Sequence, residues 1–309
     1  MQKINKIGVL YGGSSSEREI SIQSGEGVHK AILDLGYNSD LIEFNNLKDL
    51  SELSNYDFIF IALHGFEGEG GQIQKNLDDL NILYSGSNSQ CCKNTWNKKL
   101  TKQILNHNNI NTPIWYEVSK LPSVKSHHTK LSSSCFDMFR PFNAIFLKPQ
   151  EDGSSIDIFK ITNDENSISA IQKCLNPNRP FIYEEYISGK EFTVTIIDNI
   201  CLPPIEIISK NEFYDYDAKY LSDDTLLIEA KLNKKELIEI NSISINAFNA
   251  LNCKGWARVD LIQDIDGEFY VIEINTVPGM TSHSCVPKSG SFSGLSYNEV
   301  VEKIIDASF

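Results

Sequence analysis

The stretch Ala257–Ser284, ARVDLIQDIDGEFYVIEINTVPGMTSHS, decides how this chain builds its functional centre. Apolar and polar residues alternate from Ala257 to Gln263 and again from Glu268 to Asn275, which is the pattern of half-buried strands. The intervening Asp-Ile-Asp-Gly segment, Asp264–Gly267, is typical of a tight turn. The stretch therefore predicts a β-hairpin.

Three oxygen-bearing side chains share one face of the predicted hairpin. Glu273 and Asn275 are two residues apart and so point to the same face, and Asp260 on the partner strand can lie opposite them. Two carboxylates and an amide suit a hard cation such as Mg²⁺, which also takes ligands from substrate phosphates. Arg258 shares that face and could hold an oxyanion beside the metal.

The alternative is an edge hairpin whose carboxylates merely face water, as most Asp and Glu side chains do. The residues that follow Asn275 favour the functional interpretation. Thr276–Ser284 are mostly small and polar, and the N–H of Gly279 could approach a reacting group closely. We therefore expect a catalytic centre where the hairpin ends.

The composition fits a small-molecule enzyme better than a nucleic-acid-binding protein. The 309 residues suffice for two or three lobes, and 41% hydrophobic with 22% charged residues argues against disorder. A formal net charge of −13 repels nucleic acid and anionic membranes, so a phosphate ligand would need local cations or a metal.

The seven cysteines lack Cys-x-x-Cys spacing, as in reduced cytosolic proteins. No stretch approaches the roughly 18 apolar residues of a membrane span, so we expect a cytoplasmic chain that is neither anchored nor exported.

The N-terminal part alternates strand and helix signals. Lys6–Tyr11 is a short apolar run, followed by the glycine- and serine-rich Gly12–Ser16 and by a helical pattern that stops at Gly36. A strand around residues 40–44 and the apolar run Asp57–Leu63 continue the alternation, which predicts a mostly parallel sheet. By spacing alone Gly12–Ser16 is a plain turn, because it lacks both the dinucleotide fingerprint and the P-loop lysine.

The chain resembles the D-alanine–D-alanine ligases, which are ATP-grasp enzymes. The resemblance rests on Arg258-Val-Asp260 and Glu273–Ser284, and it joins several motifs in one order from Gly12 onwards. It implies an α/β fold with an N-terminal parallel-sheet, Rossmann-like domain at 1–94, followed by a two-lobed ATP-grasp fold at 95–182 and 183–309. The implied reaction is the ATP-dependent, ADP-forming ligation of two D-alanines through an acyl phosphate, for bacterial peptidoglycan precursor synthesis.

The resemblance also implies which residues surround the two D-alanines. They are Glu17 and His64 for the first D-alanine, Ser284 and Cys285 for the second, Arg258 and Gly279 for the oxyanion, and Ser154 and Tyr220 for a closing loop. Glu17 would hold the first ammonium group, and Tyr220 would contact Ser154 when the loop is shut.

A further set of residues is implied for ATP and metal. They are Lys98, Lys148 and Ser155 for the phosphates, Lys219 for the γ-phosphate, Glu184 for the exocyclic amine of the adenine, backbone groups near Glu185, Tyr186 and Ile187 for the base, Glu191 for the ribose, and Asp260, Glu273 and Asn275 for two Mg²⁺ or Mn²⁺ ions. Without the resemblance, Lys98 would be interpreted as a surface lysine and the glutamates as ordinary rim charges. The Gly-Ser-Ser run at 153–155 offers N–H groups and hydroxyls that can close over a triphosphate.

Four places depart from the family pattern: Phe66-Glu67 after His64, Trp96-Asn97 before Lys98, Ile156-Asp157 in the Gly-Ser-Ser loop, and Cys285. The Asp157 departure predicts a stiffer and more acidic loop.

The alternative functions are a D-alanine–D-lactate ligase or another carboxylate–amine ligase of this fold, and a non-catalytic ATP-binding module. Tyr220 favours an amine acceptor. The complete set of oxygens expected to bind metal and of lysines expected to bind phosphates argues against a non-catalytic module. The family further implies a homodimer, without nucleic acid and without membrane insertion.

Overall fold

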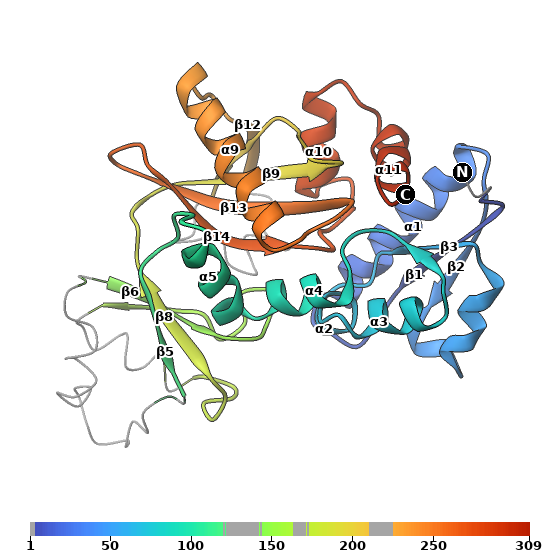
Figure 1. The fold of residues 1–309 in the computed structure, drawn as a ribbon, viewed down its shortest axis with the longest axis horizontal. Helices are drawn as coiled ribbons and strands as arrows, with labels where there is room; N and C mark the ends of the chain where they lie inside the picture. The colour runs from blue at the N-terminus through green and yellow to red at the C-terminus, as the bar shows by residue number, and fades with distance from the viewer. Residues whose placement is uncertain are drawn as a thin grey trace.

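The computed structural model describes residues 4–119, 121, 142, 144–162, 171, 173–209 and 225–309. The described strands form three sheets, and helices join the sheets or cover them (Figure 1). None of the described helices is both long enough and apolar enough to cross a membrane.

The first sheet is parallel, as the alternating pattern predicts. Its strands follow the order β2 (Asn38–Glu43), β1 (Lys6–Tyr11), β3 (Phe58–Ile61) and β4 (Leu83–Tyr84). Every residue of β3 is buried, which explains its uninterrupted apolar sequence. The helices of this part are α1 (Arg18–Asp34), α2 (Phe66–Glu69) and α3 (Gln72–Asp79), with 3₁₀ turns at Phe44–Asn46 and Leu50–Asn55.

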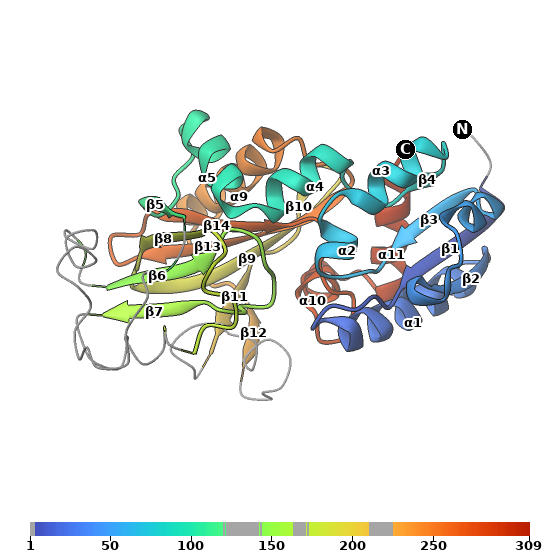
Figure 2. The same ribbon diagram turned by 90° about the horizontal axis from the view of Figure 1, so that it is seen from below.

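The last helix of the chain returns to this first sheet. Helix α11 (Tyr297–Asp306) lies beside α1, and Figure 2 shows both on the same side of the sheet. Its buried face, Val300, Val301, Ile304 and Ile305, joins the core that contains Ile7, Val9 and Phe58. The C-terminal segment thus packs against the N-terminal sheet, which ties the two ends of the chain together.

The second sheet is antiparallel, with the order β5 (Trp115–Val118), β8 (Phe181–Glu185), β6 (Ala144–Pro149) and β7 (Phe159–Thr162). It has its own apolar cluster around Ile145, Leu147 and Phe181. Helices α4 (Ser89–Trp96) and α5 (Lys98–His107) connect the first sheet to it. Each helix begins at an asparagine cap, since Asn88 accepts the N–H of Cys91 at 2.9 Å and Asn97 accepts the N–H of Leu100 at 3.0 Å.

The third sheet contains the predicted hairpin, which is confirmed as β13 (Trp256–Asp264) and β14 (Phe269–Asn275). The strand order is β12 (Leu226–Glu229), β11 (Ile205–Ile208), β9 (Gly189–Ile197), β13 and β14, and β10 (Ile200–Cys201) pairs with β9. Helix α9 (Lys234–Ala250) packs on this sheet through Ile240, Ala247 and Phe248. Helix α10 (Cys285–Phe292) follows the hairpin and its loop.

Candidate active site

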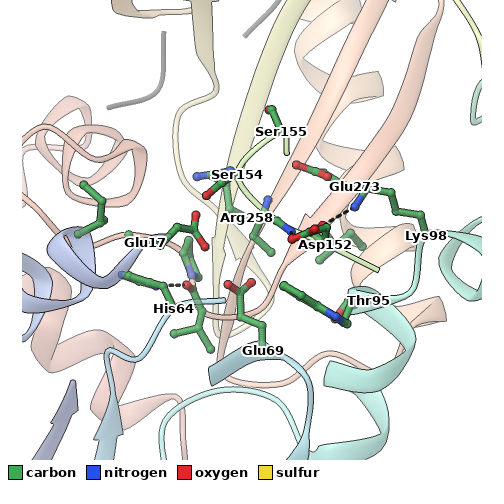
Figure 3. Close-up of a pocket in the computed structure, with 18 of the residues that line it drawn as sticks. Glu17, His64, Glu69, Thr95, Lys98, Asp152, Ser154, Ser155, Arg258 and Glu273 are labelled. Carbon is green, nitrogen blue, oxygen red and sulfur yellow. Dashed lines mark hydrogen bonds between the residues drawn. The ribbon is translucent and has the colours of Figure 1, made fainter. Parts of the chain in front are cut away.

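Two pockets meet at the end of the β13–β14 hairpin. We call the first the acidic pocket, and its charged or polar lining includes Glu17, His64, Glu69, Lys98, Asp152, Ser154, Arg258, Glu273 and Asn275 (Figure 3). We call the second the apolar pocket, which lies between the second and third sheets and includes Phe146, Lys148, Glu184, Glu185, Ile187, Glu191, Ile207 and Asp260. Ser155, Ile158 and Glu273 line both pockets. A group bound in one pocket can therefore reach a group bound in the other beside Glu273.

The hairpin brings the predicted metal residues together through a register shift, a β-bulge, between Asp260 and Leu261. Asp260 pairs in register with Glu273, and Arg258 pairs with Asn275. Asp260 accepts hydrogen bonds from Thr193 Oγ1 at 2.6 Å, from Arg258 Nε and Nη2 at 2.9 Å each, and from Asn275 Nδ2 at 2.9 Å. Neighbours on β9, β13 and β14 thus hold one carboxylate in a fixed orientation.

This donor set fits a hard cation that draws part of its coordination from a ligand. The candidate donors on Asp260, Glu273 and Asn275 are oxygens, which suit Mg²⁺ or Mn²⁺. Over the described ranges, no three His, Cys, Asp or Glu side chains are grouped so that they could hold a metal ion. Asp260, Glu273 and Asn275 are therefore the residues that could hold such a cation.

His64 ties three segments together beside the acidic pocket. Its Nδ1–H donates to the carbonyl of Val277 at 2.9 Å, and its Nε2 accepts from the hydroxyl of Ser24 at 3.2 Å, in the tautomer that satisfies both contacts. Ser24 Oγ also accepts the N–H of Met280 at 3.0 Å. Burial lowers the pKa of His64, so the ring is neutral at neutral pH. Both nitrogens of this predicted substrate-site histidine are thus engaged in positioning α1 and the loop after β14.

Glu69 is an acidic-pocket residue that the sequence interpretation missed. Its carboxylate accepts the N–H of Gly65 at 3.1 Å, and it lines the same pocket as Glu17 (Figure 3). Burial, and then the charge of Glu17, raises the pKa of Glu69 to about 8. One signal could have found it, because Glu69 lies in the glycine-rich segment directly after a central parallel strand, where α/β sheets bind ligands.

Two of the four departures from the family pattern contact each other. The rings of Phe66 and Trp96 lie 6.0 Å apart, which joins α2 to the end of α4. Glu67, next to Phe66, accepts hydrogen bonds from the hydroxyl and the N–H of Ser14 at 2.6 and 2.8 Å. The carboxylate of Glu67 is therefore engaged by the Gly12–Ser16 turn.

The predicted phosphate loop, Gly153–Asp157, has a backbone that non-glycine residues rarely adopt. The φ angle is +54° at Ser154, +59° at Ser155 and +54° at Asp157. The Ser154 hydroxyl is buried and has no hydrogen-bond partner among the described residues. Such strain and an unsatisfied hydroxyl are typical of loops that bind a ligand.

The same loop brings phosphate-side and substrate-side groups together. Lys98 Nζ donates to the carbonyl of Asp152 at 2.6 Å, at the start of the loop (Figure 3). A Cβ atom added at Gly153 would lie 3.4 Å from Glu17 Oε2. The predicted ammonium-binding carboxylate therefore lies directly against the predicted phosphate loop.

Arg179 holds both ends of this loop. Its Nη1 lies 2.5 Å from Asp152 Oδ2, and its Nη2 lies 2.6 Å from Asp157 Oδ2. Asp157 also accepts the N–H of Leu175 at 2.9 Å. These bonds agree with the expectation of a stiffer loop, but Arg179 compensates the extra negative charge that Asp157 adds.

The apolar pocket contains most of the residues predicted for ATP. Lys148 Nζ forms an ion pair with Glu184 Oε1, and Glu185, Ile187 and Glu191 line the pocket as well. Tyr186 is not among the residues that line this pocket within the described ranges.

Two backbone groups predicted to contact a base have other partners. The N–H groups of Glu185 and Tyr186 donate to the carbonyls of Ile114 and Ala144 at 2.8 and 3.1 Å. Because these bonds hold the end of β8 in place, the two N–H groups are not available to a base.

The loop after the hairpin gives Gly279 and Ser284 adjacent positions. A Cβ atom added at Gly279 would lie 2.8 Å from Ser284 Oγ, so this close approach favours glycine. Ser284 Oγ accepts the N–H of Thr281 at 3.0 Å.

Cys285 is 3% exposed and packs in a cluster with Ile205 and Ile207, so its side chain does not line either pocket. The predicted contact between Cys285 and a substrate is therefore not seen, because α10 turns that side chain into the core.

Lys219 and Tyr220 lie outside the described residues. Their assignments to the γ-phosphate and to Ser154 stay predictions.

Comparisons with known proteins show which family the chain is similar to. The family described as D-ala D-ala ligase C-terminus matches residues 104–306. A D-alanine–D-alanine ligase of Glaesserella parasuis is 36% identical over 99% of both chains, and one from a Marinomonas species is 38% identical over 98% of this chain and 95% of the relative. A crystal structure of the D-alanine–D-alanine ligase from Bacillus anthracis complexed with ATP superposes with a TM-score of 0.82, 31% identity, and coverage of 98% of this chain and 97% of that one.

The chain belongs to the D-alanine–D-alanine ligase family. Membership of this family accounts for the order of the motifs along the whole chain. The family match itself contains the hairpin and the apolar pocket, whereas Glu17, His64 and Glu69 precede residue 104 and are covered by the full-length relatives. The ATP-grasp fold is likewise supported over nearly the whole length by the Bacillus anthracis structure.

Proposed function

We propose that the chain joins two D-alanines into D-alanyl-D-alanine with ATP, for bacterial peptidoglycan precursor synthesis. One observation supports this most directly: the apolar pocket and the acidic pocket share Glu273 in their lining, beside Asp260. A nucleotide in the apolar pocket and a carboxylate substrate in the acidic pocket would then meet at the metal-binding residues. Phosphoryl transfer needs this arrangement, because catalysis there is mostly positioning and charge stabilisation.

The apolar pocket suits an adenine nucleotide. Apolar side chains such as Phe146, Ile187 and Ile207 would pack on the base, and Glu184 would accept its exocyclic amine. Glu191 would bind the ribose, and the triphosphate would extend toward Glu273. This orientation follows from the lining, since Ser155 and Glu273 mark the side on which the second pocket opens.

In the first step, an oxygen of the first D-alanine's carboxylate attacks the γ-phosphorus, the bond between the γ-phosphorus and the bridging oxygen breaks, and ADP leaves. The product is an acyl phosphate. Glu17 would hold the ammonium of this D-alanine, while Lys98 and Lys148 would offset the charge of the phosphates. Two Mg²⁺ or Mn²⁺ ions at Asp260, Glu273 and Asn275 would supply further charge neutralisation.

In the second step, the amine of the second D-alanine attacks the acyl carbon, loses a proton, and displaces inorganic phosphate as the carbon–oxygen bond breaks. The negative oxygen of the tetrahedral intermediate would lie near Arg258 and the N–H of Gly279. Each such donor typically contributes about 3 kcal/mol to lowering the barrier. Asp260 supports this role, because it holds the Arg258 guanidinium through two hydrogen bonds of 2.9 Å.

The remaining parts of the proposal follow the family. Ser284 would bind the carboxylate of the second D-alanine, and Lys219 and Tyr220 would close over the site from outside the described residues. The chain would work as a homodimer in the cytoplasm.

The test is release of inorganic phosphate from ATP with D-alanine, with L-alanine and with neither, together with mass spectrometry of the products. We expect D-alanine alone to drive release and to yield a dipeptide. An ammonium on Glu17 and a carboxylate at the metal site determine two substituents of the α-carbon, so inversion of that centre sends the methyl group in another direction. Equal release with both enantiomers would exclude the substrate assignment, and a D-alanyl-D-lactate product from mixed acceptors would identify the alternative ligase.

A further inference from the structure

Lys102 is a fully buried lysine to which neither the motifs nor the proposed reaction gives a role. It lies on α5, its side chain is 1% exposed, and it does not line the acidic or the apolar pocket. Its Nζ lies 2.6 Å from Glu184 Oε2 and donates to Thr112 Oγ1 at 2.7 Å. Thr112 in turn donates to the carbonyl of Val271 on β14 at 2.7 Å. Thr112 thus links the Lys102 ammonium to the third sheet, while the ammonium points at the Glu184 carboxylate on the second sheet.

Glu184 is the link between Lys102 and the apolar pocket. Its side chain is also 1% exposed, and its other oxygen, Oε1, forms the ion pair with Lys148. Glu184 Oε2 is close to Lys102 but receives no well-oriented hydrogen bond from the described residues. That oxygen therefore keeps acceptor capacity for a ligand, although its charge is compensated.

A buried carboxylate needs such compensation to stay ionised. Lys102 and Lys148 provide it, because the Nζ atom of each lies against one oxygen of Glu184. Burial lowers the pKa of both lysines to about 7, and the negative charge of nearby Glu273 favours their charged forms. If Lys102 were absent, only Lys148 would remain beside Glu184, and in the proposed reaction Lys148 also serves the phosphates. Loss of the Lys102 charge would therefore favour the protonated form of the buried carboxyl group.

The protonation state of Glu184 decides which base it can recognise. An ionised carboxylate only accepts hydrogen bonds, whereas a protonated one can also donate. An acceptor suits the 6-amino group of adenine and repels the 6-keto oxygen of hypoxanthine or guanine. A donor would tolerate the keto group.

We propose that Lys102 is a positioning residue that holds Glu184 as an ionised acceptor and thereby sets the preference for a 6-amino over a 6-keto purine nucleotide. This inference rests on the proposed function, because it assumes that the nucleotide base lies in the apolar pocket. Lys102 acts through Glu184 and does not touch the ligand.

The test compares ATP with ITP, which differ at position 6 of the base, in wild type and in Lys102→Met. We expect Lys102→Met to raise KM for ATP about 10- to 100-fold, as for loss of a hydrogen bond to a charged group. KM for ITP should change little, so the ATP-over-ITP preference should fall by a similar factor, while KM for D-alanine stays unchanged. Lys102→Arg keeps the charge and should keep the preference. Lys99→Met, on the same helix but paired at the surface with Glu117 at 2.8 Å, is the matched control and should behave as wild type.

A second variant pair covers the case in which Lys102→Met does not fold. Removal of both members of a buried ion pair is usually tolerated better than removal of one. Lys102→Met with Glu184→Gln should therefore fold, and its ATP-over-ITP preference should equal that of Glu184→Gln alone. A further loss of preference in the double variant would show that Lys102 acts independently of Glu184 and would overturn the inference.

The readouts also separate this inference from the proposed function. If Lys102→Met lowers kcat/KM for ATP and ITP by the same factor, Lys102 has only a structural role and the inference is wrong. Calorimetric binding of ADP and IDP repeats the comparison without ligation. If wild type shows no D-alanine-dependent phosphate release but ADP binding is still preferred in a Lys102-dependent way, the proposed function fails and the base-recognition inference stands.

Discussion

The apolar pocket and the acidic pocket handle buried charge in opposite ways. In the apolar pocket, Glu184 lies between the ammonium groups of Lys102 and Lys148, so the charges compensate one another within the protein. In the acidic pocket, Glu69 lies near Glu17, and burial together with this like charge raises the pKa of Glu69 to about 8. The first pocket is preorganised by its own ion pairs, whereas the second is complementary to positive charge that a ligand brings.

This difference agrees with the proposed substrates. The base of a nucleotide is neutral, so the protein must supply and balance the charges that recognise it. A D-alanine brings an ammonium group and a metal-bound triphosphate brings cations, and both favour the ionised form of nearby carboxylates. Besides Ser155 and Ile158, the charged residue Glu273 lines both pockets.

The largest effect is expected where the pockets join. Glu273→Gln should reduce turnover by about 1,000-fold, because a metal that stabilises the transition state by several kcal/mol loses a carboxylate ligand. The melting temperature should hardly change, since Glu273 is a local charge at the end of β14. Phosphate release over a range of Mg²⁺ concentrations measures this, with Glu268→Gln in the exposed turn of the same hairpin as the control. A wild-type rate at every Mg²⁺ concentration would contradict the metal assignment.

An intermediate effect is expected from the loop that both pockets share. Arg179→Met should raise KM for ATP by about tenfold, the equivalent of one lost hydrogen bond to a charged group. It should also destabilise the protein by about 3 kcal/mol, because Asp157 is left buried at 4% exposure without its cation. Kinetics and urea unfolding measure the two effects, and Lys173→Met at an exposed position nearby is the control. If Arg179→Met combined with Asp157→Asn did not recover part of the stability, the ion pair would not be the cause.

The smallest effect concerns the acidic pocket alone and depends on pH. The folded protein holds a proton on Glu69 up to about pH 8, whereas the unfolded chain releases it near the ordinary glutamate value of 4.5. The folded state therefore binds more protons between these values, and the contribution of Glu69 to stability is full below pH 4.5 and is lost as pH rises through 8. Glu69→Gln removes this dependence, so it should match wild type at pH 5 and be more stable at pH 9.

Urea unfolding of wild type and Glu69→Gln at both pH values tests this expectation. Glu26→Gln, at an exposed position of α1, makes the same charge change outside the pocket and is the control. A constant difference between wild type and Glu69→Gln at the two pH values would show that Glu69 does not titrate as described.

Sequence motifs predicted which residues lie together in the acidic pocket, but they did not predict the direction of every side chain. Glu17, Ser154, Lys98 and Glu273 were predicted from separate motifs and line one pocket. Cys285 was predicted beside the second substrate from its place after Ser284, yet its side chain packs with Ile205 and Ile207. Sequence position placed Cys285 at the start of α10, but the direction of its side chain depends on how that helix packs against β11.

The sequence by itself determined the hairpin and the face on which its oxygen ligands lie. Strand periodicity is a local property, so alternation within Ala257–Asn275 was enough to predict two strands and a shared face for Glu273 and Asn275. The exact pairing of Asp260 with Glu273 depends on a register shift between Asp260 and Leu261 that only the folded hairpin shows. The parallel first sheet followed in the same way from alternating strand and helix signals.

Only the tertiary structure decided which charges are buried together. Lys102 and Glu184 are 82 residues apart on a helix and a strand, Arg179 reaches back to Asp152 and Asp157, and Glu69 comes close enough to Glu17 to change its pKa. Ion pairing and desolvation depend on distance and burial in the folded chain, which no local pattern of residues contains. For that reason the metal face of the hairpin could be predicted from sequence, whereas the electrostatics of the two pockets could not.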